Sequence, residues 1–344
     1  MRSAVDVAVD DGEAIGALTV LRAGVGGRVQ DLGRPGHRHR GVPEGGAFDL
    51  PSHALANAMV GNGPEAASLE LTLFGGSFRA EVPLAVALAG APMPATRRGT
   101  DGSPRRFSPP IAFGMRAGDV LELGGAASGV RTYLAVRGGW RSPVVLGSRS
   151  EERPIRPGDV LPAVPGWSPV RWPGPDVIDP VDDEAPIRVV DGPDAGLLDD
   201  RRWHRHAFEV LPESDRMGLR LDGPEVGVSA LADRLSVPVS PGAVQVSGGR
   251  PIVLGVACGT MGGYPYVAHV VSVDLRRLAQ ARPGRPIRFR PISLEHARRL
   301  DRADRLRRSR SRLRVASLSR DVPGGLPGPG SGNSALPGRG GSVS

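Results

Sequence analysis

Acidic and basic side chains gather on one glycine-rich stretch early in the chain. Asp31 and Arg34 lie beside Gln30 in the segment Gln30-Asp31-Leu32-Gly33-Arg34. A carboxylate can accept an amide proton, and a guanidinium fork can hold a carboxylate or phosphate through two parallel hydrogen bonds. The stretch therefore predicts a site that binds the anionic group during phosphoryl or carboxyl transfer to an amide. The alternative is that Asp31 and Arg34 pair with each other and fix the turn.

The glycines that follow suggest a backbone cradle. Gly41, Gly45 and Gly46 can direct N–H groups at an anion, or can form a tight turn before a helix. Glu70 belongs to the alternating pattern Leu69-Glu70-Leu71, which by itself favours a solvent-facing carboxylate.

A second polar loop is bracketed by Arg137 and by the run Ser148-Arg149-Ser150. A guanidinium flanked by two hydroxyl groups suits phosphate or carboxylate binding. Because all the basic residues of this chain are arginines, an Arg beside a Ser can also arise by chance.

Polar residues in the second half of the chain are candidates for a binding wall. Arg216 and Gln245 stand near apolar strands, and Thr260 and Gly262-Gly263-Tyr264 form a small polar run. The alternative for each is hydrogen bonding within a core.

The remaining nucleophile and metal candidates are weaker. Cys258 is typical of a small buried residue, since no cationic residue adjoins it in the sequence. His37 and His39, like His204 and His206, have a spacing that could bind a metal on a strand, but exposed loop histidines are commoner. We predict no metal site.

The composition indicates two β-rich domains. The chain has 344 residues, 40% of them hydrophobic and 4% aromatic, with 49 Gly and 34 Pro, which favours aliphatic cores and short elements. The absence of lysine excludes a Walker A lysine, a Schiff base and a biotin-carrying side chain. One cysteine excludes an internal disulfide. We find no secretory signal and no membrane-spanning run, and expect a cytoplasmic protein.

The net charge of +8 comes from one end of the chain. Residues 297–344 hold eleven Arg and three Asp, so this segment carries the whole excess and residues 1–296 sum to zero. We predict an Arg-rich, Gly/Pro/Ser-rich disordered tail, because the segment is too charged to bury a face. On that basis nucleic-acid binding is unlikely.

These candidates must be positioned by short strands. Runs typical of strands recur at Ser68–Leu73, Ser77–Ala80, Leu84–Ala89, Val120–Leu123 and Thr132–Val136. Helices are predicted at about 50–60, with Asp49 as N-cap and Pro51 in the first turn, at Leu275–Ala281 after Asp274, and at Ser293–Leu300. We predict a leader at 1–16, domains at 17–165 and 187–296, and a linker at 166–186.

Several blocks carry a family resemblance in order along the chain. They are the segments Val29–Gly36, Gly41-Val42-Pro43, Gly45–Asp49, Leu69–Leu73, Tyr133–Gly139, Gly147–Ser150, Ser214–Leu221, Gly242–Val246 and Gly262–Pro265. Together they resemble the biotin-dependent carboxyltransferase family, which includes the C component of 5-oxoprolinase and subunit 2 of allophanate hydrolase. The resemblance covers about residues 18–296.

The resemblance implies a mainly β fold of two cyclophilin-like β-barrel domains with a few short helices. It implies a carboxyltransferase-like partner, the B component, which together with an A component completes an ATP-dependent 5-oxoprolinase acting on a small amide, with Mg²⁺ supplied in trans or bound to substrate. The residues assigned to catalysis are Asp31, Arg34, Glu70 and Arg149. Those assigned to substrate or nucleotide binding are Gln30, Gly45, Gly46, Arg137, Ser148, Ser150, Arg216, Gln245, Thr260, Gly262, Gly263 and Tyr264.

Two other functions remain open. One is a carboxyltransferase acting on urea or a similar amide, with biotin carried on another protein. The other is a non-catalytic regulator that antagonises a kinase-inhibitor-like homologue of the B component. Two departures bear on this choice: Ala257 and Gly259 replace an acidic residue and a glutamine, and the loop Glu151–Pro157 is short.

Overall fold

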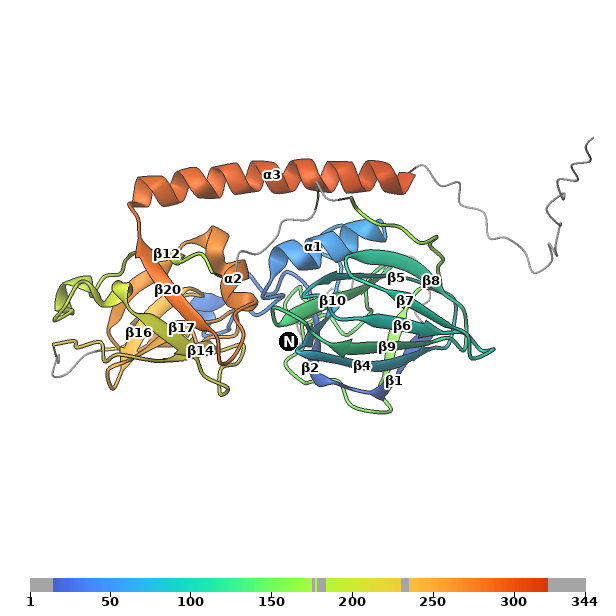
Figure 1. Cartoon of the computed structure of the whole chain (residues 1–344), viewed down its shortest axis with the longest axis horizontal. Coiled ribbons are helices and arrows are strands. Elements are labelled where there is room, and N and C mark those ends of the chain that lie inside the picture. Colours follow the sequence, from blue (N-terminus) through green and yellow to red (C-terminus); the bar gives the residue numbers. More distant parts are fainter. Residues whose placement is uncertain (1–14, 175–176, 178–183, 230–234, 321–344) are drawn as a thin grey trace, which may run out of the picture.

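The computed structural model describes residues 15–174, 177, 184–229 and 235–320. Strands dominate, and they form two units that lie side by side under one long helix, α3 (Figure 1). The predicted mainly β fold is confirmed. Residues 1–14, the greater part of the predicted leader, lie outside the described residues, and strand β1 already begins at Ile15.

The first domain consists of two antiparallel sheets around one core. One sheet has the order β11-β1-β4-β9-β6-β7 and the other the order β2-β3-β10-β5-β8. Leu18, Phe78 and Leu121 from the first sheet meet Leu69 and Leu134 from the second in a single buried cluster. The strands are β1 (Ile15–Arg22), β2 (Val25–Gln30), β3 (Ser68–Thr72), β4 (Phe74–Ala80), β5 (Leu84–Gly90), β6 (Ala95–Arg98), β7 (Pro104–Phe107), β8 (Ile111–Met115), β9 (Val120–Gly125), β10 (Arg131–Val136) and β11 (Val160–Ala163).

Helix α1 (Leu50–Met59) covers the outer face of the second sheet. As predicted, Asp49 caps it, accepting a hydrogen bond from the Ser52 N–H at 3.1 Å, and a proline stands in its first turn. The sheet presents small side chains to the helix, among them Ala87 and Ala135. The helix therefore buries the sheet's second face, and Glu70 on β3 is 2% exposed rather than solvent-facing.

The second domain is a closed barrel. Its strand order is β12-β19-β16-β17-β14-β13-β20, with β12 and β20 parallel and the other pairs antiparallel. Trp203, Phe208 and Phe289 pack together inside it. Its elements are β12 (Ile187–Asp191), β13 (Ala207–Val210), β14 (Gly218–Asp222), β16 (Ala243–Ser247), β17 (Arg250–Leu254), β19 (Tyr266–Val270), β20 (Pro286–Pro291), the small pair β15 (Val237–Pro238) and β18 (Met261–Gly262), and α2 (Leu275–Ala279).

Short 3-10 turns complete the fold at η1 (Arg38–Arg40), η3 (Ala195–Leu197), η4 (Trp203–Arg205) and η5 (Ser272–Asp274). Asp274 precedes α2 as predicted, but its carboxylate does not cap the helix. It binds Arg188 on β12 instead, accepting from Nε at 2.8 Å and from the backbone N–H at 2.7 Å.

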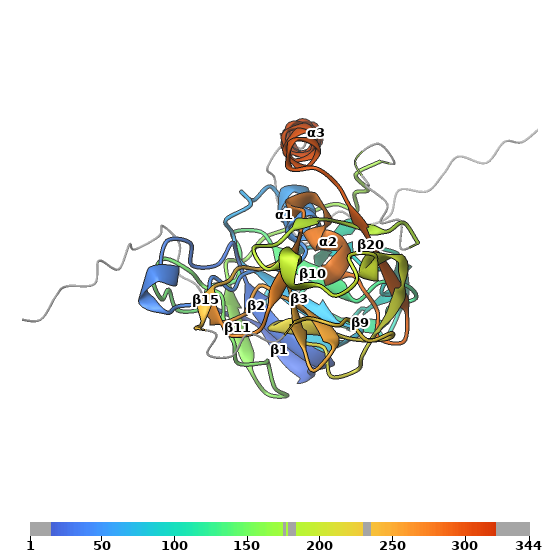
Figure 2. The same cartoon turned by 90° about the vertical axis from the view of Figure 1, so that its left-hand side faces the viewer.

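The prediction of a disordered tail is wrong for residues 297–320. Helix α3 (Leu294–Arg320) starts at the second domain and crosses to the first, where it lies above α1 (Figures 1 and 2). Asp301 accepts a hydrogen bond from Ser272 at 2.8 Å. Val315 is buried in the apolar cluster that includes Ala56 and Met59 of α1, called here the α1 cluster. The helix contacts the body through the Ser272–Asp301 hydrogen bond and through Val315, and its sequence shows no broad apolar stripe. Residues 321–344 lie outside the described residues.

The described part of the predicted linker begins on the surface of the first domain. Gly166 N–H donates to Pro83 O at 2.9 Å, and Arg171 forms a β-bridge with Ala112. Residues 166–171 therefore pack as part of the first domain.

Candidate functional site

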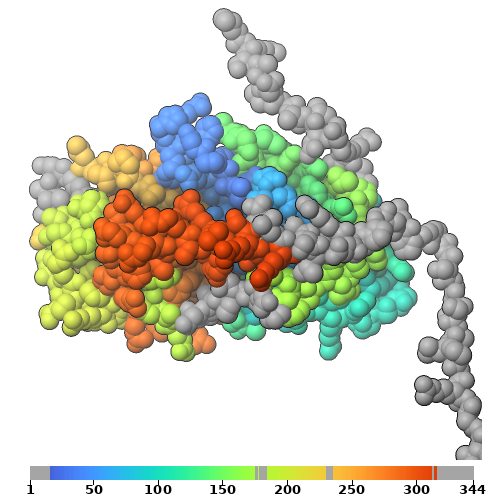
Figure 3. Space-filling view, turned by 90° about the horizontal axis from the view of Figure 1, so that it is seen from above, coloured from blue at the N-terminus to red at the C-terminus, as the bar shows by residue number. Residues whose placement is uncertain are grey.

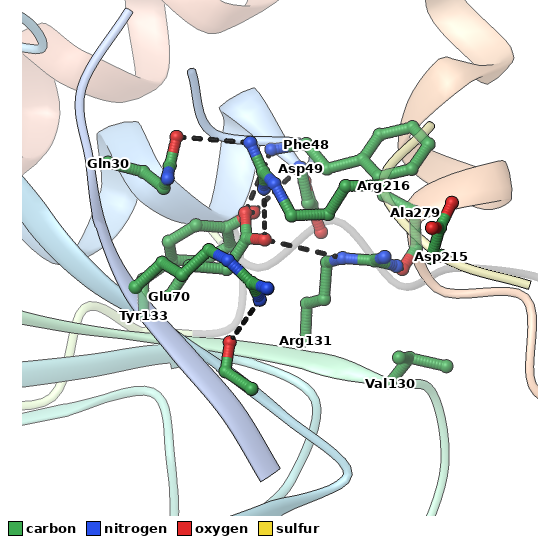
Figure 4. A network of polar contacts seen from close by, with 12 residues as sticks. Gln30, Phe48, Asp49, Glu70, Val130, Arg131, Tyr133, Asp215, Arg216 and Ala279 are labelled. Carbon is green, nitrogen blue, oxygen red and sulfur yellow. Dashed lines mark hydrogen bonds and ion pairs between the residues drawn. The ribbon is translucent and has the colours of Figure 1, made fainter. Parts of the chain in front are cut away.

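Glu70 forms the centre of a buried ion network between the two domains (Figure 4). Its Oε1 accepts from Arg216 Nη1, which comes from the loop before β14, and lies 3.5 Å from Arg131 Nε. Its Oε2 accepts from the Phe48 N–H at 2.9 Å and from the Tyr133 hydroxyl at 2.7 Å. The carboxylate is thus saturated by donors from both domains.

The environment keeps Glu70 ionised. Burial alone would raise its pKa, but the charges of Arg216 and Arg131 and the two hydrogen bonds outweigh burial and lower the pKa to about 2. Burial and the neighbouring Glu70 raise the pKa of Tyr133, so its hydroxyl stays protonated and donates. A carboxylate with so low a pKa is a poor general base, and this one has no exposed face for substrate. Its geometry supports structure rather than catalysis.

Arg216 and Gln30 belong to the same network. Arg216 Nη2 donates to Gln30 Oε1 at 3.0 Å and to the Gly46 carbonyl at 2.6 Å. Gln30 Nε2 donates to the Glu151 carbonyl at 2.7 Å. These predicted binding residues are brought together, and the terminal polar atoms of both side chains are occupied by protein, whereas the buried Arg216 Nε has no hydrogen-bond partner.

Gln280 makes a second buried link between the domains. Its Oε1 accepts from the N–H groups of Val130 and Arg131, and its Nε2 donates to Asp49 Oδ2 at 2.7 Å and to Arg131 O at 2.9 Å. Arg131 also donates to the Ala279 carbonyl and stacks over a phenylalanine ring 4.5 Å away. Arg131, Tyr133 and Gln280 are interface residues that the sequence did not indicate. Only the unusual position of polar side chains in strand and helix patterns could have indicated them.

Asp31 fastens two loops together. Its Oδ1 accepts from Ser148 Oγ and Ser150 Oγ, each at 2.6 Å, and from the Gly33 N–H at 2.8 Å. Its Oδ2 accepts from the Arg149 N–H. Asp31 is 6% exposed. Asp31 and the run Ser148-Arg149-Ser150 are predicted as parts of two separate polar loops, and the structure brings these loops together. The serines face the carboxylate and not open solvent.

Arg34 does not pair with Asp31, so that alternative is wrong. Arg34 Nε donates to the Val145 carbonyl at 3.1 Å, and Nη2 donates to the Ser150 carbonyl. Arg149 turns its guanidinium to the Ser142 carbonyl. Both arginines are half-buried and shape the loop at 142–150.

The glycine segment closes as a hairpin against the second domain. The Ala47 N–H donates to Asp31 O at 2.8 Å, and the Gly45 N–H donates to Val256 O at 3.0 Å. Gly45 and Gly46 both have positive φ, and a Cβ on Gly46 would lie 2.7 Å from the Gly33 nitrogen. The N–H of Gly45 in the predicted anion nest is therefore already occupied by a carbonyl of the protein.

Arg38, at the tip of this hairpin, reaches across to the second domain. Its Nη2 donates to the carbonyls of Val239 and Gly259. Arg38 also lies beside the Cys258 thiol, a cationic neighbour that the sequence did not indicate. Burial nevertheless raises the pKa of Cys258 in spite of Arg38, so the thiol is not activated.

The loop at 256–264 forms the open rim beside the hairpin. Gln245 is buried and donates to the Tyr264 carbonyl at 3.1 Å, which fixes the loop, and Val239 N–H donates to Thr260 O at 3.0 Å. Tyr264 itself is 51% exposed, and Gly263 is exposed. Of the predicted polar residues on these loops, Tyr264 is exposed, and Thr260, Arg34 and Arg149 are half-buried.

The two departures from the family pattern are Ala257 with Gly259 and the short loop after Ser150, and the backbone is hydrogen-bonded at both. Ala257 N–H donates to Arg216 O at 3.0 Å, and a Cβ on Gly259 would meet only the Met261 carbonyl at 3.6 Å. A larger side chain would therefore fit at Gly259, so the backbone does not require glycine there. The short loop after Ser150 runs beside β2, where the Arg28 Nε donates to Glu152 O at 2.7 Å.

Arg137 is not part of this assembly. It is exposed at the far end of β10, where its side chain lies against Gly166. Within the described ranges, no three His, Cys, Asp or Glu residues are grouped as a metal site requires. Likewise no helix there is long and apolar enough to cross a membrane.

Three loops, at 31–47, 142–151 and 256–264, are joined by these hydrogen bonds at the junction between the domains. Of the predicted binding residues at this junction, Gln30, Ser148 and Ser150 hydrogen-bond to protein groups, and Arg216 does so through Nη1 and Nη2. As arranged, they do not form a cradle for ATP. The exposed groups at the rim can orient a polar substrate or a partner, but the described residues do not by themselves assemble an acid–base pair.

Comparison with known families places this two-domain β architecture among the carboxyltransferase domains. Residues 40–291 match the family model described as carboxyltransferase domain, subdomain A and B, and the chain belongs to this family.

Its relatives belong to two enzyme systems. The chain is 34% identical over 309 residues to the C component of the Escherichia coli 5-oxoprolinase, covering 81% of this chain and 93% of that protein. It is 31% identical to urea amidolyase of Lachancea kluyveri, covering 83% of this chain and 17% of that protein. The crystal structure of the K. lactis urea amidolyase aligns with a TM-score of 0.75 at 26% identity over 88% of this chain and 20% of that one.

Proposed function

We propose that this chain is the C-type component of an ATP-dependent 5-oxoprolinase that requires two further components. The observation that carries the proposal is the alignment with the C component of 5-oxoprolinase, which spans nearly the whole length of that relative. The urea amidolyases are much longer proteins of which this chain matches a small part.

The site geometry supports a role that depends on a partner. Glu70, Asp31 and Gln30 are buried and saturated, so they hold the loops in place and do not act on substrate directly. The rim formed by the exposed Tyr264 and the half-buried Thr260 and Arg34 is then the part of this chain that meets substrate or the facing partner protein. We propose that ATP binds in the assembled complex, where the B component supplies groups that this chain does not present.

The test is ATP hydrolysis by the chain co-purified with its A and B components, with and without 5-oxoproline. We expect 5-oxoproline to stimulate hydrolysis, and Tyr264→Ala to reduce the stimulated rate at least about tenfold, as loss of a positioning contact commonly does. Arg137→Gln, at an exposed site away from the junction, is the matched control and should leave the rate unchanged. A stable complex without stimulation would contradict the proposal.

A second candidate is a carboxyltransferase that accepts the carboxyl group from biotin on another protein. It is favoured by the structural similarity to urea amidolyase over 88% of the chain. Urea-dependent consumption of carboxybiotin by the same complex, with no response to 5-oxoproline, would select this function.

A further inference from the structure

The outer surface of α3 carries a row of exposed arginines. Arg298, Arg299, Arg302 and Arg310 are all exposed, and they fall away from the side of the helix that buries Val315 on α1. The helix lies on the surface of the molecule across both domains (Figure 3). At 1.5 Å per residue, its 27 residues extend for about 40 Å.

Acidic and basic residues are sorted between the two sides of the helix. Asp301 accepts from Ser272 and pairs with Arg305 at 2.8 Å. Asp304 is half-buried and pairs with Arg307 at 2.6 Å and with Arg308. Both aspartates are thus used on the side that faces the body. In the described part of α3, Glu295 at the first turn is the remaining acid, so the outer face is almost purely cationic.

This basic face lies outside the part of the chain that the family model matches. The family model matches residues 40–291 and ends before α3 begins. Residues 1–296 have no net charge, so the positive field is concentrated at this end of the chain. A basic stripe on a neutral body is the electrostatic footprint of a polyanion-binding surface.

The side chains on this face indicate which kind of polyanion it can bind. Leu306, 54% exposed, is the large apolar residue exposed along the middle of the helix. A single such residue is too little apolar surface for a helix that inserts into a membrane. It also provides no cluster of apolar anchors for a protein partner. The described part of the helix contains no Phe, Tyr or Trp on which single-stranded bases could stack. Guanidinium forks match phosphate oxygens, and about 40 Å of helix exceeds one turn of a duplex.

We propose that the outer face of α3 binds the phosphate backbone of double-stranded nucleic acid without reading its sequence. The docked helix holds its arginines in place before binding, whereas a disordered basic tail would lose conformational entropy on association. This is why the folded helix supports an interaction that the sequence alone made unlikely.

The experiment measures binding of the full chain to a fluorescent 20-base-pair duplex by anisotropy as salt is varied. Four arginine–phosphate contacts predict a slope of log K against log[salt] of about −3 to −4, hence about 100-fold weaker binding for a fourfold rise in salt. Changing Arg298, Arg299, Arg302 and Arg310 together to Gln should abolish most of the affinity and flatten the slope. Gln keeps helix propensity, so the variant should fold normally, as circular dichroism would show.

A control variant separates this face from net charge. Arg105, Arg106, Arg285 and Arg288 are exposed on the two domains, and changing them to Gln removes the same charge elsewhere. We expect this control to bind the duplex like the wild type. Equal losses in both variants, no binding by the wild type, tighter binding to a single strand of equal charge, or arginine-dependent binding to anionic vesicles in place of the duplex would each overturn the proposal.

Discussion

Arg216 donates through Nη1 to Oε1 of Glu70, a carboxylate 146 positions earlier in the chain and in the other domain. The same guanidinium also holds Gln30 and the Gly46 carbonyl, so one side chain of the second domain organises three segments of the first. This buried contact therefore fixes the positions of the loops of the candidate site.

Replacing Glu70 by Gln should destabilise the protein by about 3–5 kcal/mol, because Arg216 and Arg131 would remain buried without their anionic partner. Urea unfolding measures the change. Tyr133→Phe, which removes one neutral donor to the same carboxylate, is the comparison and should cost about 1–2 kcal/mol. A Glu70→Gln variant as stable as the wild type would show that the network is not structural.

The same carboxylate predicts a dependence of stability on pH. Its folded-state pKa of about 2 lies below the ordinary value of 4.5, so its contribution is complete above about pH 5 and is lost as the pH falls toward 2. Between pH 7 and pH 3.5 the wild type should lose about 1.4 kcal/mol through this group. The measurement is the difference in unfolding free energy between wild type and Glu70→Gln at both pH values. A difference that does not change with pH would contradict the lowered pKa.

Asp31→Asn should loosen the loop at 142–150 without unfolding the domain. The amide would place a donor where Asp31 now accepts, losing hydrogen bonds from Ser148, Ser150 or the Arg149 N–H, at a cost of about 2–3 kcal/mol. Limited proteolysis should cut this loop faster in the variant. Asp159 pairs with Arg153 and is more exposed than Asp31. Asp159→Asn therefore serves as the control and should leave the cleavage rate unchanged.

Val315→Asp should release the second half of α3 from α1, because a carboxylate would be buried among the apolar side chains of the α1 cluster. Hydrogen exchange of amides between Asp304 and Val315 should accelerate by about tenfold or more. Leu306→Asp, at an exposed position on the same helix, should cause no such change. Unchanged protection in the Val315 variant would mean that the helix is held elsewhere.

Local sequence patterns predicted the positions of the helices and strands better than they predicted which residues are buried. The cap at Asp49, the helix that follows it and the strands from Ser68 to Val136 depend on neighbours in sequence, and all are found. No prediction grouped Asp31 with Ser148 and Ser150, because these residues lie 117 and 119 positions apart and meet only in the folded chain. Glu70 was misjudged from its pattern because α1 covers the face that an isolated strand would expose.

The sequence alone determined the β-rich class, the absence of lysine chemistry and the concentration of positive charge in the last 48 residues, because composition and short-range periodicity are properties of the chain itself. Tertiary structure decided which candidates are buried. Arg216 meets Glu70, Arg38 meets Gly259, and α3 docks through Val315 only because distant segments are packed together. Charge pairing and burial depend on that packing, and no spacing along the chain encodes them directly.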